Sequence, residues 1–92
     1  MSDKQIIVTV SGVDKVGIVA RVTAELAKFE VNIEDIKQTL MQGHFVMFLL
    51  GNIENSKSSF TEIKDGLTNL GKEMGMEIWV QRKEIFDNMH QI

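Results

Sequence analysis

Two hydrophobic periodicities alternate along this chain, and their alternation is the feature that most restricts its fold. A spacing of two residues is typical of β-strands, and spacings of three and four are typical of an amphipathic helix. The chain passes from the first spacing to the second and back again in its first half, and it repeats the change in its second half. The pattern therefore predicts two successive strand–helix–strand units.

In the first unit, a β-branched strand over residues 5–10 precedes a helix over residues 16–29. A second strand over residues 31–42 follows, and a tight turn at Gln42-Gly43-His44 leads into a third strand over residues 45–51. The apolar face of the helix is formed by residues spaced four, four and three apart, namely Ile18, Val22, Leu26 and Phe29.

The second unit contributes another helix and a fourth strand. Ser59 and Glu62 match the capping box that begins a helix, and Gly71 and Gly75 are expected to loosen and end that helix. The fourth strand covers residues 76–82. The tail beyond it could form a short amphipathic helix, with an apolar stripe of Ile85, Phe86 and Met89.

The order βαββαβ permits few layouts, because crossover connections are right-handed and the hairpin is short. The favoured layout is an α+β, ferredoxin-like sandwich: a four-stranded antiparallel sheet in the order 4-1-3-2, with both helices on one face. We expect one domain over residues 1–82 and a C-terminal tail over residues 83–92, which could pack on the sheet or on a partner subunit.

One apolar run does not suit a sheet whose second face meets water. Residues 45–50 are apolar at six consecutive positions, and Trp79 points away from the neighbouring inward residues of its strand. Alternate residues of a strand face opposite sides, so both faces of this strand are apolar. We therefore expect the tail or a second subunit to cover the open face, and a homodimer with two-fold symmetry.

Composition excludes several classes of function. The 92 residues contain no cysteine, which removes disulfides, thiolate catalysis and cysteine-ligated zinc. The formal net charge of -3 argues against a nucleic-acid partner, which requires clustered lysine and arginine. The sequence shows neither a signal peptide nor a run of about 20 apolar residues, so we expect a cytoplasmic protein without a membrane partner.

The loop between the first strand and the first helix leaves two interpretations open. It lacks the phosphate-binding glycine motifs, but Gly17 lies beside the free amides of a helix start, where a carboxylate could bind. Gly12 and Gly17 could instead only permit the turn. Likewise, Asp14 is either the N-cap or a contact for a ligand's amino group, and Asn32 is either a turn residue or a polar anchor.

No residue pattern predicts catalysis, a metal site or a cofactor. His44 and His90 are the only histidines, and neither has a second ligand at a useful spacing. The serines lack a paired base in any known arrangement. The methionines occupy positions that favour packing in the core.

The segment "IIVTVSGVDKVGIVARVTAELAKFEVNIEDIKQTL" resembles the first half of an ACT domain. The marks are an apolar strand, a loop with D-x-x-G-I/V, an amphipathic helix and V-N-I entering the second strand. The resemblance covers roughly residues 5–82. The closing "VQRKEIFDNMHQI" is similar to the tail of small stand-alone bacterial and archaeal ACT proteins.

The resemblance implies a regulatory module that binds an amino acid or a similar small effector, acts as a homodimer and has no catalysis of its own. A regulated protein partner could accompany it. In serine-binding ACT domains the ligand lies between two copies, and the matching positions here are Asp14, Gly17 and Asn32. Their neighbours would frame the ligand, namely Val13, Lys15, Val16 and Ile18.

Two other functions remain as alternatives. The chain could be a protein-interaction module with a vestigial ligand site, which docks its sheet face or its tail. It could also be an enzyme similar to acylphosphatases, which share the sandwich and carry an arginine in a glycine-rich loop. Arg21, however, comes four residues after Gly17, a full turn along the predicted helix.

Overall fold

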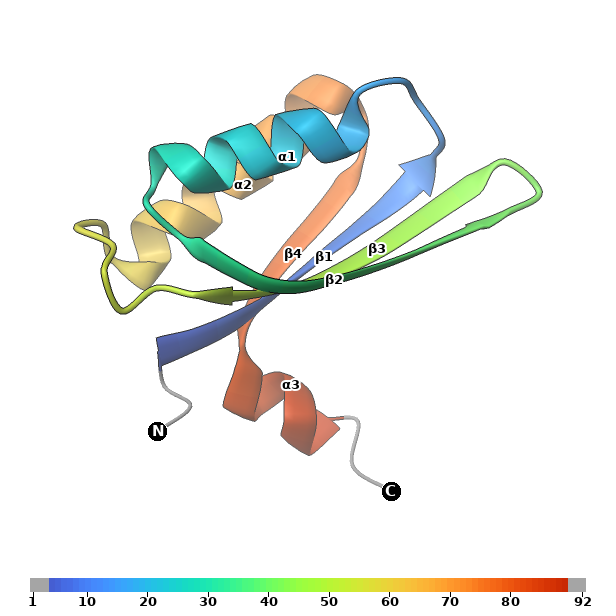
Figure 1. Cartoon of the computed structure of the whole chain (residues 1–92). Coiled ribbons are helices and arrows are strands. Elements are labelled where there is room, and N and C mark those ends of the chain that lie inside the picture. Colours follow the sequence, from blue (N-terminus) through green and yellow to red (C-terminus); the bar gives the residue numbers. More distant parts are fainter. Residues whose placement is uncertain (1–3, 90–92) are drawn as a thin grey trace.

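The computed structural model describes residues 4–89 and confirms the predicted α+β sandwich (Figure 1). The sheet order is β2-β3-β1-β4 with every neighbouring pair antiparallel, and α1 and α2 lie on one face. The elements are β1 (Gln5–Val13), α1 (Ile18–Lys28), β2 (Asn32–Met41), β3 (His44–Asn52), α2 (Phe60–Met74), β4 (Glu77–Arg82) and α3 (Lys83–Met89).

The core fills the space between this sheet and the two long helices. In β1, alternate residues point toward the helices, and the buried ones include Ile6, Val8 and Val10. The predicted faces of both helices are buried against them, with Val22, Leu26, Ile63 and Leu67 fully inaccessible. The apolar face of the sheet and the apolar faces of the two helices thus pack into one layer. This packing fixes the positions of the loops at the edges of the layer.

The hairpin between β2 and β3 has the predicted two-residue turn. Gln42 has a φ of 51° and Gly43 a φ of 81°, which is the combination of a type I′ turn. Such a turn matches the right-handed twist of the strands that it joins. Pairing therefore continues to Met41 and His44, at the base of the turn.

Helix α2 confirms the capping box but corrects the role of Gly71. Ser59 and Glu62 exchange both capping hydrogen bonds, and Gly75 ends the helix in the left-handed conformation. Gly71 does not loosen the helix, which continues to Met74. A Cβ at Gly71 would lie 2.8 Å from the Met76 carbonyl oxygen, so the missing side chain lets α2 pack closely on the chain that enters β4.

Helix α3 covers part of the open sheet face of its own chain (Figure 1). The rings of Phe86 and Phe48 are 6.2 Å apart, so the tail does supply cover for the apolar strand β3. Ile85, another residue of the predicted stripe, does not join this contact within the chain, since its exposed fraction is 50%. The side chain of Met89 lies outside the described residues.

Candidate functional site

The loop between β1 and α1 is held by its neighbours on both sides. The Asp14 N–H donates to the Gly43 carbonyl at 2.9 Å, which ties the loop to the turn of the hairpin. The Lys15 ammonium group donates to the Met74 carbonyl at the end of α2. Lys15, which the resemblance places around a ligand, therefore also anchors the loop to the second helix.

Helix α1 begins without a side-chain cap. The N-cap is Gly17, with a φ of 86°, and no side chain accepts a hydrogen bond from the first turn. The expected N-cap role of Asp14 is therefore wrong. Because a left-handed residue cannot belong to a right-handed helix, α1 starts at Ile18 and not at the expected residue 16.

The first turn of α1 is consequently electropositive. The first helical bond of this turn runs from the Arg21 N–H to the Gly17 carbonyl at 2.9 Å, so the amides of residues 18–20 have no helical partner. The first turn contains no acidic residue that could balance the helix dipole, whereas α2 has Glu62 at the same place. The two helices of one sheet face thus differ sharply at their N-termini.

The predicted loop residues surround this helix start in different ways. Val16 is fully exposed, Asp14 is exposed, and Ile18 is buried beneath the first turn. Apart from its chain neighbours, none of the described residues lies within 4 Å of the place that a Cβ on Gly17 would occupy. The approach to the helix start is therefore open to solvent.

A hollow of about 310 Å³ lies beside the loop. Asp14 contributes one wall, and the remaining walls come from the hairpin residues Gln38, Thr39, Leu40 and Phe45. Sequence reasoning missed these hairpin residues. The two-residue turn was the signal that could have found them, because it pairs Leu40 with Phe45 close to the end of β1.

Asn32 lies far from the loop within one chain. It is the first residue of β2, pairs with Asn52, and is exposed. The loop follows β1 at the other end of the sheet, where Val13 pairs with His44. The structure therefore gathers Asp14, Lys15, Val16, Gly17 and Ile18, but it does not bring Asn32 to them.

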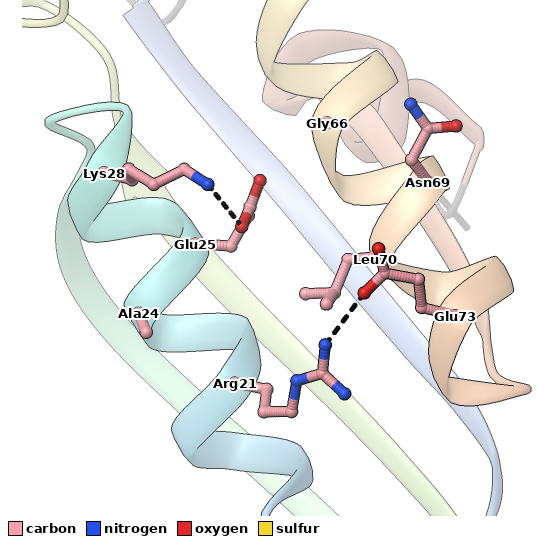
Figure 2. A pocket seen from close by; sticks show the side chains of 8 residues that line it. All are labelled: Arg21, Ala24, Glu25, Lys28, Gly66, Asn69, Leu70 and Glu73. Carbon is pink, nitrogen blue, oxygen red and sulfur yellow. Dashed lines mark hydrogen bonds and ion pairs between the residues drawn. The ribbon is translucent and has the colours of Figure 1, made fainter.

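A second hollow, of about 490 Å³, separates the outer faces of α1 and α2 (Figure 2). Its charged side chains pair with one another: Arg21 with Glu73 at 2.9 Å, and Lys28 with Glu25 at 3.4 Å. Arg21 thus lies along the helix surface, away from the β1–α1 loop. The charged side chains of this groove are paired with one another, whereas the first amides of α1 have no helical partner. The start of α1 is therefore the better candidate for binding a ligand.

The ACT domain family model matches residues 4–81. This chain belongs to the ACT domain family. Within it, the chain groups with the UPF0237 proteins of bacteria and archaea. A UPF0237 protein of Listeria innocua is 43% identical over 94% of this chain and 97% of its own length. One of Methanococcus maripaludis is 46% identical over 97% of this chain and 99% of its own.

Solved structures agree with this membership. An ACT domain protein from Streptococcus pneumoniae superposes on this ACT domain with a TM-score of 0.78 and 34% identity, covering 90% of this chain and 93% of its own. The regulatory subunit of aspartate kinase from Thermus thermophilus has a TM-score of 0.67 at 20% identity, over 87% of this chain and 52% of its own. The second likeness shows the shared fold alone.

ACT domains are regulatory ligand-binding modules. Among residues 4–89, none of the helices has the length and apolar character needed to cross a membrane. The same residues contain no cluster of three or more histidine, cysteine or acidic side chains suited to a metal ion.

Proposed function

We propose that this ACT domain is a regulatory homodimer that binds an amino acid or a similar small acid and has no catalysis of its own. Residues 1–82 form the ACT domain in this proposal, and residues 83–92 form its tail. The observation that carries the proposal is the uncapped, open N-terminus of α1 beside the hollow at Asp14. A ligand carboxylate would accept hydrogen bonds from the free amides of this helix start.

The ligand's ammonium group would then lie on the side of Asp14 or of a loop carbonyl. Val13, Val16 and the aliphatic part of Lys15 would border the ligand, and Ile18 would support the helix start from below. Members of the family that bind serine carry an imidazole two residues before the Asp14 position, where this chain has Gly12. Gly12 supplies no such side chain, and a Cβ there would lie 2.7 Å from the Met76 sulfur, so the ligand's contacts at this position would come from backbone groups.

The long edge strand β2 supports a dimer that completes this site. In the described part of the chain only one side of β2 is paired, because β3 is its single neighbour in the sheet. A second copy could pair its own β2 there in the antiparallel sense. The start of one β2 would then lie beside the end of the other, which brings Asn32 of the partner subunit to the loop. An unpaired strand of ten residues is otherwise prone to nonspecific pairing.

We expect light scattering at micromolar concentration to give about twice the monomer mass of 10.4 kDa. Leu40→Lys places a charge on the helix side of β2, beside the hollow, and should produce monomers. Met41→Lys is the matched control, because it adds the same charge at a neighbouring exposed residue on the opposite sheet face. A monomeric wild-type protein would contradict the dimer.

We expect a thermal-shift screen of amino acids and related acids to find a ligand that stabilises the protein. A ligand at 100 times its dissociation constant adds about 2.7 kcal/mol. In calorimetry with that ligand, Asn32→Ala should weaken binding by about 1–3 kcal/mol, the usual effect of removing one partner of a buried polar contact. Asn69→Ala, at an exposed residue of α2, should leave the affinity unchanged.

A second pair of variants tests the helix start. Gly17→Val should abolish close approach of the carboxylate, since its side chain would enter the open space above the first turn. Gly43→Val imposes similar backbone strain at a φ of 81° and also points into open space, so it controls for the loss of stability. Equal affinity in Gly17→Val, Asn32→Ala and wild type would place the ligand elsewhere.

Two alternatives are less well supported. A protein-interaction module with a vestigial ligand site would dimerise or dock without any response to acids in the screen. An acylphosphatase-like enzyme would need Arg21 near the loop, but Arg21 pairs with Glu73. Hydrolysis of an acyl phosphate that is lost in Arg21→Ala would favour the enzyme.

A further inference from the structure

The open face of the sheet, away from the core under α1 and α2, contains a hollow of about 360 Å³. Three aromatic side chains line it: Trp79 from β4, Phe48 from β3 and Phe86 from α3. Thr9 lies between Trp79 and Phe48, because it pairs with both in the sheet. The volume lies within the range of small-molecule sites, which are typically apolar with a few polar groups.

Thr9 is the observation that points to a ligand. It is only 8% exposed, and it is the one polar residue in the buried part of residues 4–89. Within residues 4–89 its hydroxyl makes no hydrogen bond to another protein group, although Ser11 nearby pairs with His44 at 3.1 Å. Every fully inaccessible side-chain oxygen or nitrogen of the described residues has a partner, so the Thr9 oxygen must reach the surface of the hollow.

The Thr9 hydroxyl therefore faces the hollow, where only water can bond to it in the free protein. A valine of the same shape would fit this place in the strand, and valine is common in the neighbouring positions of β1. A ligand that displaced the water would have to replace its hydrogen bond to Thr9, because a hydroxyl left without a partner is destabilising.

The other lining residues define the ligand's chemistry. Among the residues that the structure describes, no ionisable side chain lines the hollow, since the remaining contributors are Ser11, Val46 and Gln81. Aromatic rings prefer offset-stacked or edge-to-face neighbours at 4.5–7 Å, and the Phe86 and Phe48 rings already meet in this way. An uncharged, flat ring compound would satisfy these walls without desolvating a charge.

We propose that this hollow is a second ligand site, which takes a small uncharged planar compound whose polar group hydrogen-bonds to Thr9. The site is independent of the proposed effector site, because it uses the opposite face of the sheet and none of the loop residues. The aromatic walls would hold the ring, and the hydroxyl would select compounds that offer it a hydrogen-bond partner.

Trp79 makes the site directly observable, since it is the only tryptophan in the chain. Its indole N–H therefore gives a single side-chain signal of this type in a proton–nitrogen correlation spectrum. We would titrate the full chain with quinolin-2-one, an uncharged two-ring amide, up to its solubility limit. We expect a saturable shift of the Trp79 signal.

Thr9→Val tests the hydrogen bond while keeping the shape of the side chain. We expect it to weaken quinolin-2-one binding by roughly fivefold, the equivalent of one net hydrogen bond. Thr61→Val, at an exposed residue of α2, should leave the affinity unchanged. Asn32→Ala should also leave it unchanged, which separates this test from that of the proposed effector site.

Three results would overturn the proposal. The first is a Trp79 signal that does not respond to the compound, and the second is equal affinity in Thr9→Val and wild type. The third is a Trp79 signal that moves on dilution of the protein alone, in step with the mass from light scattering. That result would assign the aromatic hollow to contact between two copies of the chain.

Discussion

Leu67→Ala is expected to lower the free energy of unfolding by about 2–5 kcal/mol. Leu67 is completely inaccessible to solvent, and it lies on the face of α2 that packs against the sheet. The loss combines the transfer free energy of the removed methyl groups with that of the cavity left between helix and sheet. A chain of 92 residues typically has only about 5–14 kcal/mol of total stability, so this single change is large.

Urea denaturation at constant protein concentration measures this effect, because assembly would otherwise change the apparent stability. The matched control is Ile85→Ala, which deletes the same number of carbon atoms from a side chain that is 50% exposed and lies outside β2. We expect the control to change the free energy by no more than about 0.5 kcal/mol. Similar losses in the two variants would mean that α2 does not pack as described.

Removal of residues 83–92 should produce the second large effect. The deletion takes away α3 and with it the ring of Phe86, which covers Phe48 on the open sheet face. Full burial of a phenylalanine contributes about 1.5–3 kcal/mol, and Phe86 is only partly buried, so we expect a loss of about 1–2 kcal/mol. That corresponds to a fall in melting temperature of roughly 4–16 °C for a domain of this size.

Point variants separate the contact from the rest of the tail. Phe86→Ala should reproduce most of the loss, whereas Ile85→Ala, at the exposed neighbouring residue, should have little effect. The truncated protein should also bind more of an environment-sensitive dye such as anilinonaphthalene sulfonate. An unchanged melting temperature and solubility after truncation would show that the tail does not stabilise the sheet.

Periodicity and turn chemistry were sufficient to predict the fold. The two changes of hydrophobic spacing placed all six main elements in the correct order, and the short hairpin fixed the pairing of β2 with β3. The errors lie at the ends of elements. The sequence of α1 has apolar residues from Val16 onward, but the left-handed backbone of Gly17 delays the helix. Such a backbone angle cannot be recognised from hydrophobic spacing.

The candidate site was only partly accessible to sequence reasoning. Residues 14–18 are contiguous, so the chain itself brings them together. Leu40 and Phe45 join them through strand pairing, which depends on register. Asn32 lies at the far end of β2, away from the loop. It could contact a ligand at the loop only from a second subunit, so its proposed role depends on how two subunits pack. A single sequence contains no direct signal for that geometry.

Thr9 shows a further limit of pattern reading. Within the strand it resembles its β-branched neighbours, and its spacing assigns it to the open face of the sheet. Its burial results from Trp79 and Phe48 on the adjoining strands and from the return of the tail helix. These partners are separated in sequence by tens of residues, so only the folded arrangement reveals an isolated hydroxyl.

The hydrogen bond from Lys15 to Met74 links the loop between β1 and α1 to the far end of α2. A ligand that changes the position of this loop must therefore also change the energy of the last turn of α2. Coupling between two binding sites is reciprocal. A protein that binds the last turn of α2 in one conformation would therefore change the affinity for the effector by some factor, and the effector would change the affinity for that protein by the same factor. If the loop binds an effector as proposed, the C-terminal end of α2 is the surface at which a protein partner would sense that binding.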